Sequence, residues 1–292
     1  FPLYKLSSEI KIKNKVVLSG EGADEFFGGY ARVQNCAIDF LKLKKFGKFS
    51  KNNFVQKIFS LDKNFDYKCG FIDYFFYKYN WFSETEIKSL FQPNIINNNN
   101  LNDAKKPWFE LLNKNSNLNF YDLSLIFFQK NHLKCLLNRL DILTMANSLE
   151  ARTPFLDLDL INAINSTPFH YKIRWKSKLK RFASIFSNNF DFSEKYDVNK
   201  FLLRKLSEKY LPNDICYRKK SGFPLPMNSW MKNERIKEIL FDQRSKSRNI
   251  YNHDFIKKLY KEENNKDIYD FNGKKIWMIL NLELWMREFI DR

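Results

Sequence analysis

One stretch, VVLSGEGADEFFGGY at Val16–Tyr30, constrains the fold of this chain more than any other. A short apolar run ends there in four glycines and three acids. The run Lys15–Ser19 is rich in β-branched residues and stops at a glycine turn, which predicts a buried strand of a parallel sheet. A phosphate loop would combine its glycines with lysine, and a tight turn would need a single glycine. Because ligands bind beyond the carboxyl ends of such strands, the stretch predicts a ligand site.

The acids Glu21, Asp24 and Glu25 permit two kinds of chemistry at a strand end. They can hold a Mg²⁺ ion that carries a polyphosphate, or they can move protons. Acids this close repel one another, so they need a cation, a basic cluster or solvent beside them. The alternative is structural, since Asp24 and Glu25 at a helix start would interact favourably with the helix dipole. The loop alone does not decide between the two.

Composition excludes few classes of protein. The 292 residues are 44% hydrophobic, with 30 Phe, enough for a sizeable core. No apolar run approaches the ~18 residues of a membrane span. The net charge of +17 is spread along the chain, and abundant Lys, Asn and Phe indicate coding bias, so nucleic acid is not the expected partner. Some of that charge can still serve a polyphosphate substrate.

The cysteines and histidines predict no zinc site. They are widely spaced and include no CxxC pair: Cys36, Cys69, Cys135, Cys216, His132, His170 and His253. We expect reduced, mostly buried thiols in a cytoplasmic protein.

After Tyr30 the apolar spacing is mostly helical, over about residues 31–90. A low-complexity surface loop is expected at 92–100. A helix is predicted at Asp122–Leu140 with Asp122 as its N-cap. ARTPFLD, Ala151–Asp157, breaks the helical pattern at its proline.

Further helices are predicted at Leu158–Ser166 and Asn199–Tyr210, followed by a proline-punctuated loop at Leu211–Pro226. Lys274–Ile290 is apolar on nearly every side and predicts a buried helix. A single strand cannot form a sheet, so its partners either lie outside this chain or carry no clear sequence signal.

Two more stretches gather charged residues. RLDILTMANSLEARTPFLD, at Arg139–Asp157, predicts either a pocket or a set of structural ion pairs. YRKKSGFPLP carries Lys219 and Lys220 beside a Gly–Phe–Pro turn. Lysine on a flexible stem suits contact with a departing phosphate, although a surface lysine is the plainer interpretation.

Together the three stretches, in order and rough spacing, resemble the synthetase domain of glutamine-hydrolysing asparagine synthetase. The opening PLYKLS and the closing IWMILNLELW are also similar, and the resemblance is weakest over about residues 45–120. It implies the C-terminal part of an α/β nucleotide-binding domain, adenine nucleotide α-hydrolase-like, mostly α-helical here with its last parallel strand near 15–19. We expect one partial domain over 1–292, with the strand and acid loop in 1–30 and a helical remainder in 31–292.

The resemblance implies a carbon–nitrogen ligase that uses ATP and Mg²⁺. ATP would adenylate the side-chain carboxylate of aspartate and release pyrophosphate. Ammonia from glutamine, made by an N-terminal glutaminase domain upstream or in trans, would then attack the acyl-adenylate to give asparagine and AMP. A cytoplasmic location without membrane contact is expected, and a homodimer is compatible with the family.

The resemblance also assigns roles to residues. Ser19 and Gly20 would line the ATP site, and Glu21 would face the adenylate and the incoming ammonia, either stabilising ammonium-like charge or accepting a proton. Asp24 would bind Mg²⁺, and Lys220 would steady charge on the phosphates. The remaining residues would shape the pocket, with Glu150 placed to touch substrate: Arg139, Asp141, Glu150 and Arg152.

The family's S-G-G-x-D-S pyrophosphate loop is missing, since the only Gly–Gly pair is Gly28–Gly29 after Phe27. We therefore expect a longer natural protein, and no aspartate-dependent ATP–pyrophosphate exchange by residues 1–292 alone. Two alternatives stay open: a related amide-forming synthetase with another carboxylate substrate, and a non-catalytic interaction module. A nucleic-acid-binding module is a distant third.

Overall fold

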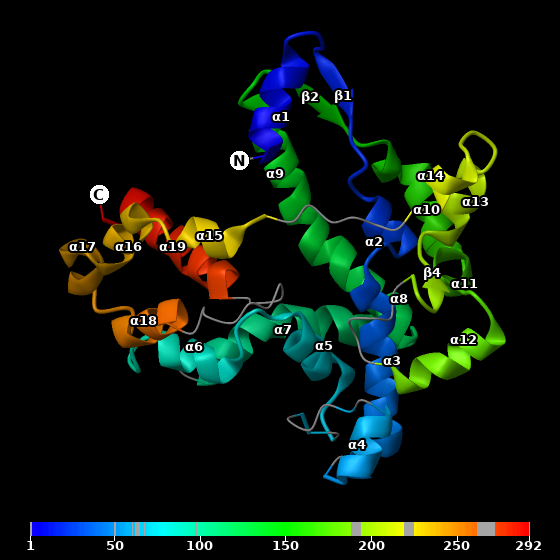
Figure 1. Cartoon of the computed structure of the whole chain (residues 1–292), viewed down its shortest axis with the longest axis horizontal. Coiled ribbons are helices and arrows are strands. Elements are labelled where there is room, and N and C mark those ends of the chain that lie inside the picture. Colours follow the sequence, from blue (N-terminus) through cyan, green and yellow to red (C-terminus); the bar gives the residue numbers. More distant parts are fainter. Residues whose placement is uncertain are drawn as a thin grey trace. The chain divides into compact units, whose positions relative to one another are not determined.

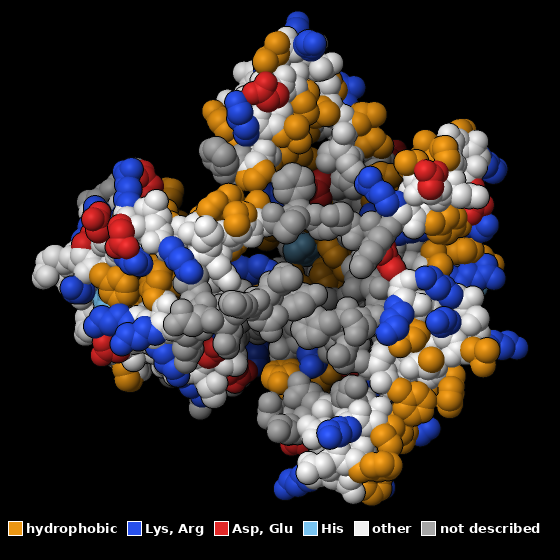
Figure 2. Space-filling model, in the orientation of Figure 1, with side chains coloured by type: hydrophobic (Ala, Val, Ile, Leu, Met, Phe, Trp, Pro, Cys, Tyr) orange, Lys and Arg blue, Asp and Glu red, His pale blue; other side chains and the backbone are white. Residues whose placement is uncertain are grey.

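The computed structural model describes residues 2–49, 51–59, 61, 65–66, 68–96, 98–187, 194–218, 225–261 and 272–291. The chain forms two compact units. Unit 1 comprises residues 1–75 and 110–220, and unit 2 comprises 76–109 and 221–292. Within the described residues, no helix is long and apolar enough to cross a bilayer. Lys and Arg side chains are scattered over the face shown in Figure 2, in keeping with the spread seen in the sequence.

A two-stranded parallel sheet positions the acid loop in unit 1. Strand β1 (Val16–Leu18) pairs with β2 (Glu150–Arg152), with Val17 opposite Ala151. The two arrows lie side by side in Figure 1. The predicted strand is therefore confirmed, but it is not the last one, because β2 follows it. Its burial was predicted wrongly, since Leu18 is 70% exposed.

Helices make up most of unit 1. The segment expected as one helix from Asp122 is α8 (Phe120–Phe127), a π-helical turn at Phe128–His132 and α9 (Leu133–Met145). Asp122 is not the N-cap. The side chain of Asn119 accepts hydrogen bonds from the backbone N–H groups of Tyr121 and Asp122, both at 3.0 Å. The other helices of this part are α1 (Pro2–Lys11), α2 (Ala23–Phe27), α3 (Ala31–Phe46), α4 (Asn53–Phe59) and α5 (Phe71–Tyr79, of which residues 71–75 belong to this unit).

The part of unit 1 after β2 follows the sequence expectation closely. Residues after β2 leave the helical pattern, as predicted, and α10 (Leu158–Ser166) has the predicted bounds. The helix expected at 199–210 is shorter, α13 (Phe201–Ser207). The expected loop at 211–226 begins with a short helix, α14 (Asn213–Cys216). A further helix pair, α11 (Phe169–Lys172) and α12 (Lys178–Ala183), flanks an antiparallel ribbon that was not predicted, β3 (Arg174–Trp175) with β4 (Asp197–Val198).

The core of unit 1 holds the helix that follows the acid loop. Phe26 and Phe27 of α2 pack with Leu133 of α9 and Ile164 of α10. Burying such side chains stabilises the fold by about 1.5–3 kcal/mol each. The acid loop is thereby fixed at both ends, by β1 before it and by this cluster after it.

All four cysteines are free thiols. Cys36 and Cys216 are buried, Cys69 is half-buried and Cys135 is exposed, so the expectation of mostly buried thiols holds for only two of them.

Unit 2 packs around α19 (Asn272–Phe289). The other helices are α6 (Glu84–Leu90), α7 (Asn98–Lys114, of which residues 98–109 belong to this unit), α15 (Met227–Met231), α16 (Glu234–Phe241), α17 (Gln243–Ser247) and α18 (His253–Lys261). The loop predicted at 92–100 is shorter, because α7 begins at its end. The prediction that α19 is buried all round is wrong. It buries one face, including Ile276 and Ile279, and exposes Trp277 and Trp285 on the other.

An ion cluster crosses the buried face of α19. Glu283 is 0% exposed and accepts from Arg248 at 2.6 and 2.8 Å and from Arg287 at 2.6 Å. Hydrogen bonds to Glu283 and Asp291 raise the pKa of Arg248. A buried carboxylate that keeps its cationic partners changes the free energy of unfolding little. Removal of one member of such a pair lowers that free energy strongly, because a buried charge is left without its partner.

We predict that Glu283→Gln lowers the free energy of unfolding by about 3 kcal/mol, because it leaves two arginines without their shared carboxylate. Urea denaturation measures the change. The matched control is Glu234→Gln in α16, whose carboxylate is 79% exposed and pairs with Lys237, and it should change the stability by less than about 1 kcal/mol. Equal effects of the two substitutions would contradict the buried cluster.

Asp197 in β4 gives a pH-dependent contribution to stability. It is 2% exposed, and its carboxylate accepts a hydrogen bond from the backbone N–H of Glu194 at 3.0 Å. Burial raises its pKa from 3.8 to about 6, while the charge of Lys176 acts in the opposite direction. The native state therefore holds this proton more tightly than the unfolded chain.

We predict that this group makes the free energy of unfolding fall as the pH rises from 3.8 to about 6. The fall amounts to about 3 kcal/mol. Asp197→Asn should remove it, so the stability difference between wild type and variant changes across that window and is constant above it. Denaturation curves at several pH values measure this difference, and parallel pH profiles would contradict it.

Candidate functional site

The loop Ser19–Gly22 leaves β1 at its carboxyl end and is tied to β2. The backbone N–H of Ser19 donates to the carbonyl of Arg152 at 2.8 Å, extending the parallel ladder by one bond. The hydroxyl of Ser19 accepts from the N–H of Glu21 at 3.3 Å, and the carbonyl of Gly20 accepts from Ala23 at 3.3 Å. These bonds turn the chain directly from the strand into α2.

The two glycines of this loop, Gly20 and Gly22, differ in whether the fold requires glycine at their position. Gly22 has φ of 94°, and an added Cβ would lie 2.4 Å from Cδ2 of Leu156, so the fold itself requires glycine there. Gly20 has nothing within 4 Å of an added Cβ and no positive φ. The open space beside Gly20 leaves its backbone accessible to a molecule from outside the chain.

The first acid, Glu21, faces an arginine from α9. Nη2 of Arg139 lies 3.3 Å from Oε1 of Glu21, across 118 residues of sequence. Both side chains remain partly accessible. The Arg139 guanidinium thus sits beside this carboxylate and leaves it partly open to a ligand.

The second acid, Asp24, pairs with a lysine that sequence reasoning missed. Nζ of Lys200 lies 2.9 Å from Oδ1 of Asp24. The backbone N–H of Gly29 also donates to the Asp24 carbonyl at 2.8 Å. An added Cβ on Gly29 would lie 1.7 Å from Asp24 Oδ1 and 2.4 Å from Lys200 Cε, so only glycine leaves room for this pair.

Lys200 sits at the N-cap of α13 with a left-handed backbone, φ 49° and ψ 40°. A non-glycine residue in this region is strained, which is common at functional sites. No local signal distinguishes Lys200 from the other basic residues in the sequence. Only the tertiary contact with Asp24 does so.

The third acid, Glu25, points into the core. It is 1% exposed, and Oε1 accepts a hydrogen bond from the hydroxyl of Tyr30 at 2.6 Å. Among the described residues Oε2 has no partner. Burial raises the pKa of Glu25 and also that of Tyr30. The three neighbouring acids are therefore kept apart, one by Arg139, one by Lys200 and one by burial.

Glu150 and Arg152 lie in β2, opposite Val16 and Leu18 of β1. They point to the same face of the strand, and Nε of Arg152 lies 2.8 Å from Oε1 of Glu150. Both are mostly exposed, so the pair contributes little to stability. Arg152 lies at the carboxyl end of the sheet, where the acid loop leaves β1, and Glu150 lies at its amino end.

The remaining predicted residues are not brought together in this way. Asp141 lies exposed on α9 and forms no ion pair within the described ranges. Lys220 lies outside the described residues. No group of three or more His, Cys, Asp or Glu side chains that could hold a metal ion occurs in the described part of the chain.

A parallel strand end that leads into an accessible acid loop is a place where α/β proteins bind ligands. The profile of the asparagine synthase family matches residues 1–287, and this chain belongs to that family. Asparagine synthetase (glutamine-hydrolyzing) 1 of Bacillus subtilis (strain 168) is 29% identical over 300 residues, which cover 97% of this chain and 42% of that protein.

A second relative, asparagine synthetase (glutamine-hydrolyzing) 3 of the same organism, is 29% identical over 216 residues, covering 74% of this chain and 27% of that protein. The chain thus spans less than half the length of these relatives. No solved structure gives a significant match.

We predict opposite outcomes for alanine at the two loop glycines. Gly22→Ala should lower the free energy of unfolding by about 1–3 kcal/mol, because it combines a left-handed backbone with a clash against Leu156. Gly20→Ala, the matched control two positions earlier, should stay within about 0.5 kcal/mol of wild type. Chemical denaturation of both variants measures this, and equal losses would show that the loop is not built as described.

Proposed function

We propose that this chain is the synthetase part of a longer enzyme that converts aspartate to asparagine at the expense of ATP. The observation that carries the proposal is the accessible Glu21–Arg139 pair beside the open backbone of Gly20, at the carboxyl end of a parallel strand. Family membership supports the same reaction class. Carboxylates are poor acyl donors, and adenylation would supply the leaving group.

Ser19 and Gly20 would meet the nucleotide through their backbone, since no side chain obstructs the approach at Gly20. Glu21 would face the acyl-adenylate. With Arg139 beside it, its carboxylate can stabilise the positive charge that develops on attacking ammonia or accept the proton that ammonia loses. Arg139 acts here as a positioning residue.

Asp24 and Lys200 would help to neutralise the charge of the phosphates, Asp24 by binding Mg²⁺ and Lys200 by orienting Asp24. Mg²⁺ would supply charge neutralisation to the departing pyrophosphate. Asp24 fits this ion because Mg²⁺ in nucleotide sites takes one or two carboxylates and completes its shell with water and phosphate oxygens. Lys200 lies 2.9 Å from Asp24 and would keep that carboxylate oriented. Lys220 would add a cation to the same phosphates from the segment after Arg218.

The Glu150–Arg152 pair would hold the amino-acid substrate. Its carboxylate and guanidinium lie 2.8 Å apart on one strand face, and they carry the charges complementary to the ammonium and carboxylate of an amino acid. Asp141 would contribute to the wall of this pocket. Aspartate is the substrate that the family favours.

Glutamine would be the source of ammonia, through a glutaminase domain elsewhere in the full-length protein. The relatives are glutamine-hydrolysing by name, and this chain spans 42% of the first of them. We place the reaction in the cytoplasm, where ATP and both amino acids are available. A homodimer stays a prediction.

We predict that Glu21→Gln in the full-length enzyme separates the two half-reactions. Asparagine formation should fall by about 10²-fold or more, because the group that manages ammonia's charge is lost. Aspartate-dependent ATP–pyrophosphate exchange should persist, because adenylation precedes the attack of ammonia. Asp24→Asn should lose both activities.

The matched control is Asp159→Asn on α10, an exposed acid of the same unit, which should leave both activities unchanged. Loss of exchange in Glu21→Gln would place that residue in adenylation instead. Full asparagine formation by Glu21→Gln would contradict the proposal.

A further inference from the structure

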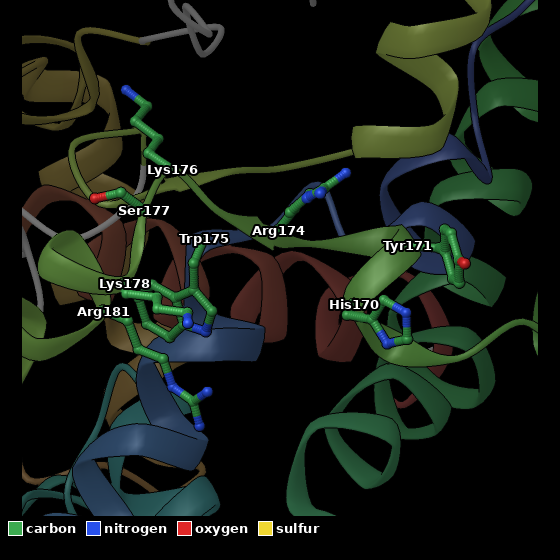
Figure 3. A pocket seen from close by; sticks show the side chains of 8 residues that line it. All are labelled: His170, Tyr171, Arg174, Trp175, Lys176, Ser177, Lys178 and Arg181. Carbon is green, nitrogen blue, oxygen red and sulfur yellow. The ribbon is translucent and has the colours of Figure 1, made fainter.

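A second feature of unit 1 shares no residue with the acid loop. A pocket of about 500 Å³ is formed by α11, β3 and the start of α12 (Figure 3). Eight residues line it: His170, Tyr171, Arg174, Trp175, Lys176, Ser177, Lys178 and Arg181. Its volume lies in the range of about 300–1,000 Å³ that holds small ligands in proteins.

The pocket is strongly basic. Arg174, Lys176, Lys178 and Arg181 are all exposed, and no acidic side chain is among the lining residues. None of these four cations pairs with a carboxylate in the part of the chain that the structure describes. The ammonium of Lys176 donates to the backbone carbonyl of Glu194, and the acid that its charge acts on, Asp197, is buried outside the pocket lining. Like charges gathered in a concave surface attract anions.

The framework of the pocket is well fixed. Trp175 packs against the buried pair Ile38 and Tyr196, and the backbone N–H of Lys176 donates to the Tyr196 carbonyl at 3.0 Å. The guanidinium of Arg174 lies 4.7 Å from the ring centroid of Phe201, a cation–π contact. A site whose walls are already ordered binds a ligand at low entropic cost.

The cations are distributed and do not converge on one point. Figure 3 shows Arg174 and Lys176 on one side of β3 and Trp175 on the other, as strand alternation requires. The guanidinium of Arg181 extends on the Trp175 side. One small monoanion could not meet all of these groups at once.

We propose that this basic pocket binds a ligand that carries several phosphate groups. Spaced phosphates match spaced cations, and arginine forms bidentate bonds to phosphate while lysine supplies point charges. A free polyphosphate and the backbone of single-stranded nucleic acid share this chemistry. The exposed Tyr171 and half-buried Trp175 add surfaces on which a base could stack. The proposal does not depend on the synthetase function.

The test measures binding of inorganic tripolyphosphate and of a short single-stranded RNA to the full chain. Calorimetry at low and at physiological salt should show binding that weakens with salt. The double variant Lys178→Gln with Arg181→Gln should bind about tenfold more weakly, because it removes two phosphate contacts. Both side chains are exposed, so the thermal midpoint should not change.

The matched control replaces two exposed lysines of the same unit outside the pocket, Lys13→Gln with Lys209→Gln. It carries the same change in net charge and should alter affinity by less than about twofold. Variant-sensitive binding of tripolyphosphate identifies a free polyphosphate as the ligand, and variant-sensitive binding of RNA alone identifies nucleic acid. Absence of binding, or equal losses in variant and control, would overturn the proposal.

Discussion

The site depends on one pairing, that of β1 with β2 in a parallel sheet. Two segments separated by more than 130 residues meet there. The N–H of Glu150 donates to the carbonyl of Lys15 at 2.9 Å, and the N–H of Ser19 donates to the carbonyl of Arg152. The first bond aligns the strands and the second fixes the start of the acid loop. Without this register, Arg152 would not lie beside the start of the acid loop.

The acid loop is stable because its three carboxyl groups lie in different surroundings. A row of charges on a single face would repel. Here Glu21 and Asp24 each receive a cation from a distant helix, while Glu25 is buried against Tyr30. A buried carboxyl anchors α2, and the other two remain partly accessible. The different surroundings of the three acids favour a chemical role for the loop over a simple capping turn.

Local pattern predicted much of the fold, and tertiary contacts decided the rest. The bounds of α10 followed from helical periodicity after a proline turn. β2 was missed because Glu150–Arg152 is three residues long and mostly charged, and a strand of this kind is recognisable only from its partner. Lys200 was missed for a similar reason, since only its ion pair with Asp24 connects it to the site. The exposed face of α19 shows that a helix apolar on nearly every side need not be buried on every side, because the neighbouring elements decide which face they cover.

A structure of the full-length protein with a non-hydrolysable ATP analogue and Mg²⁺ tests the central claim most directly. We predict the α-phosphate beside the backbone of Ser19 and Gly20, with Glu21 beside the place where the acyl-adenylate would form and the Asp24 carboxylate turned toward the metal. Nucleotide density that lies elsewhere, with this loop unchanged and Gly20 still open to solvent, would contradict it.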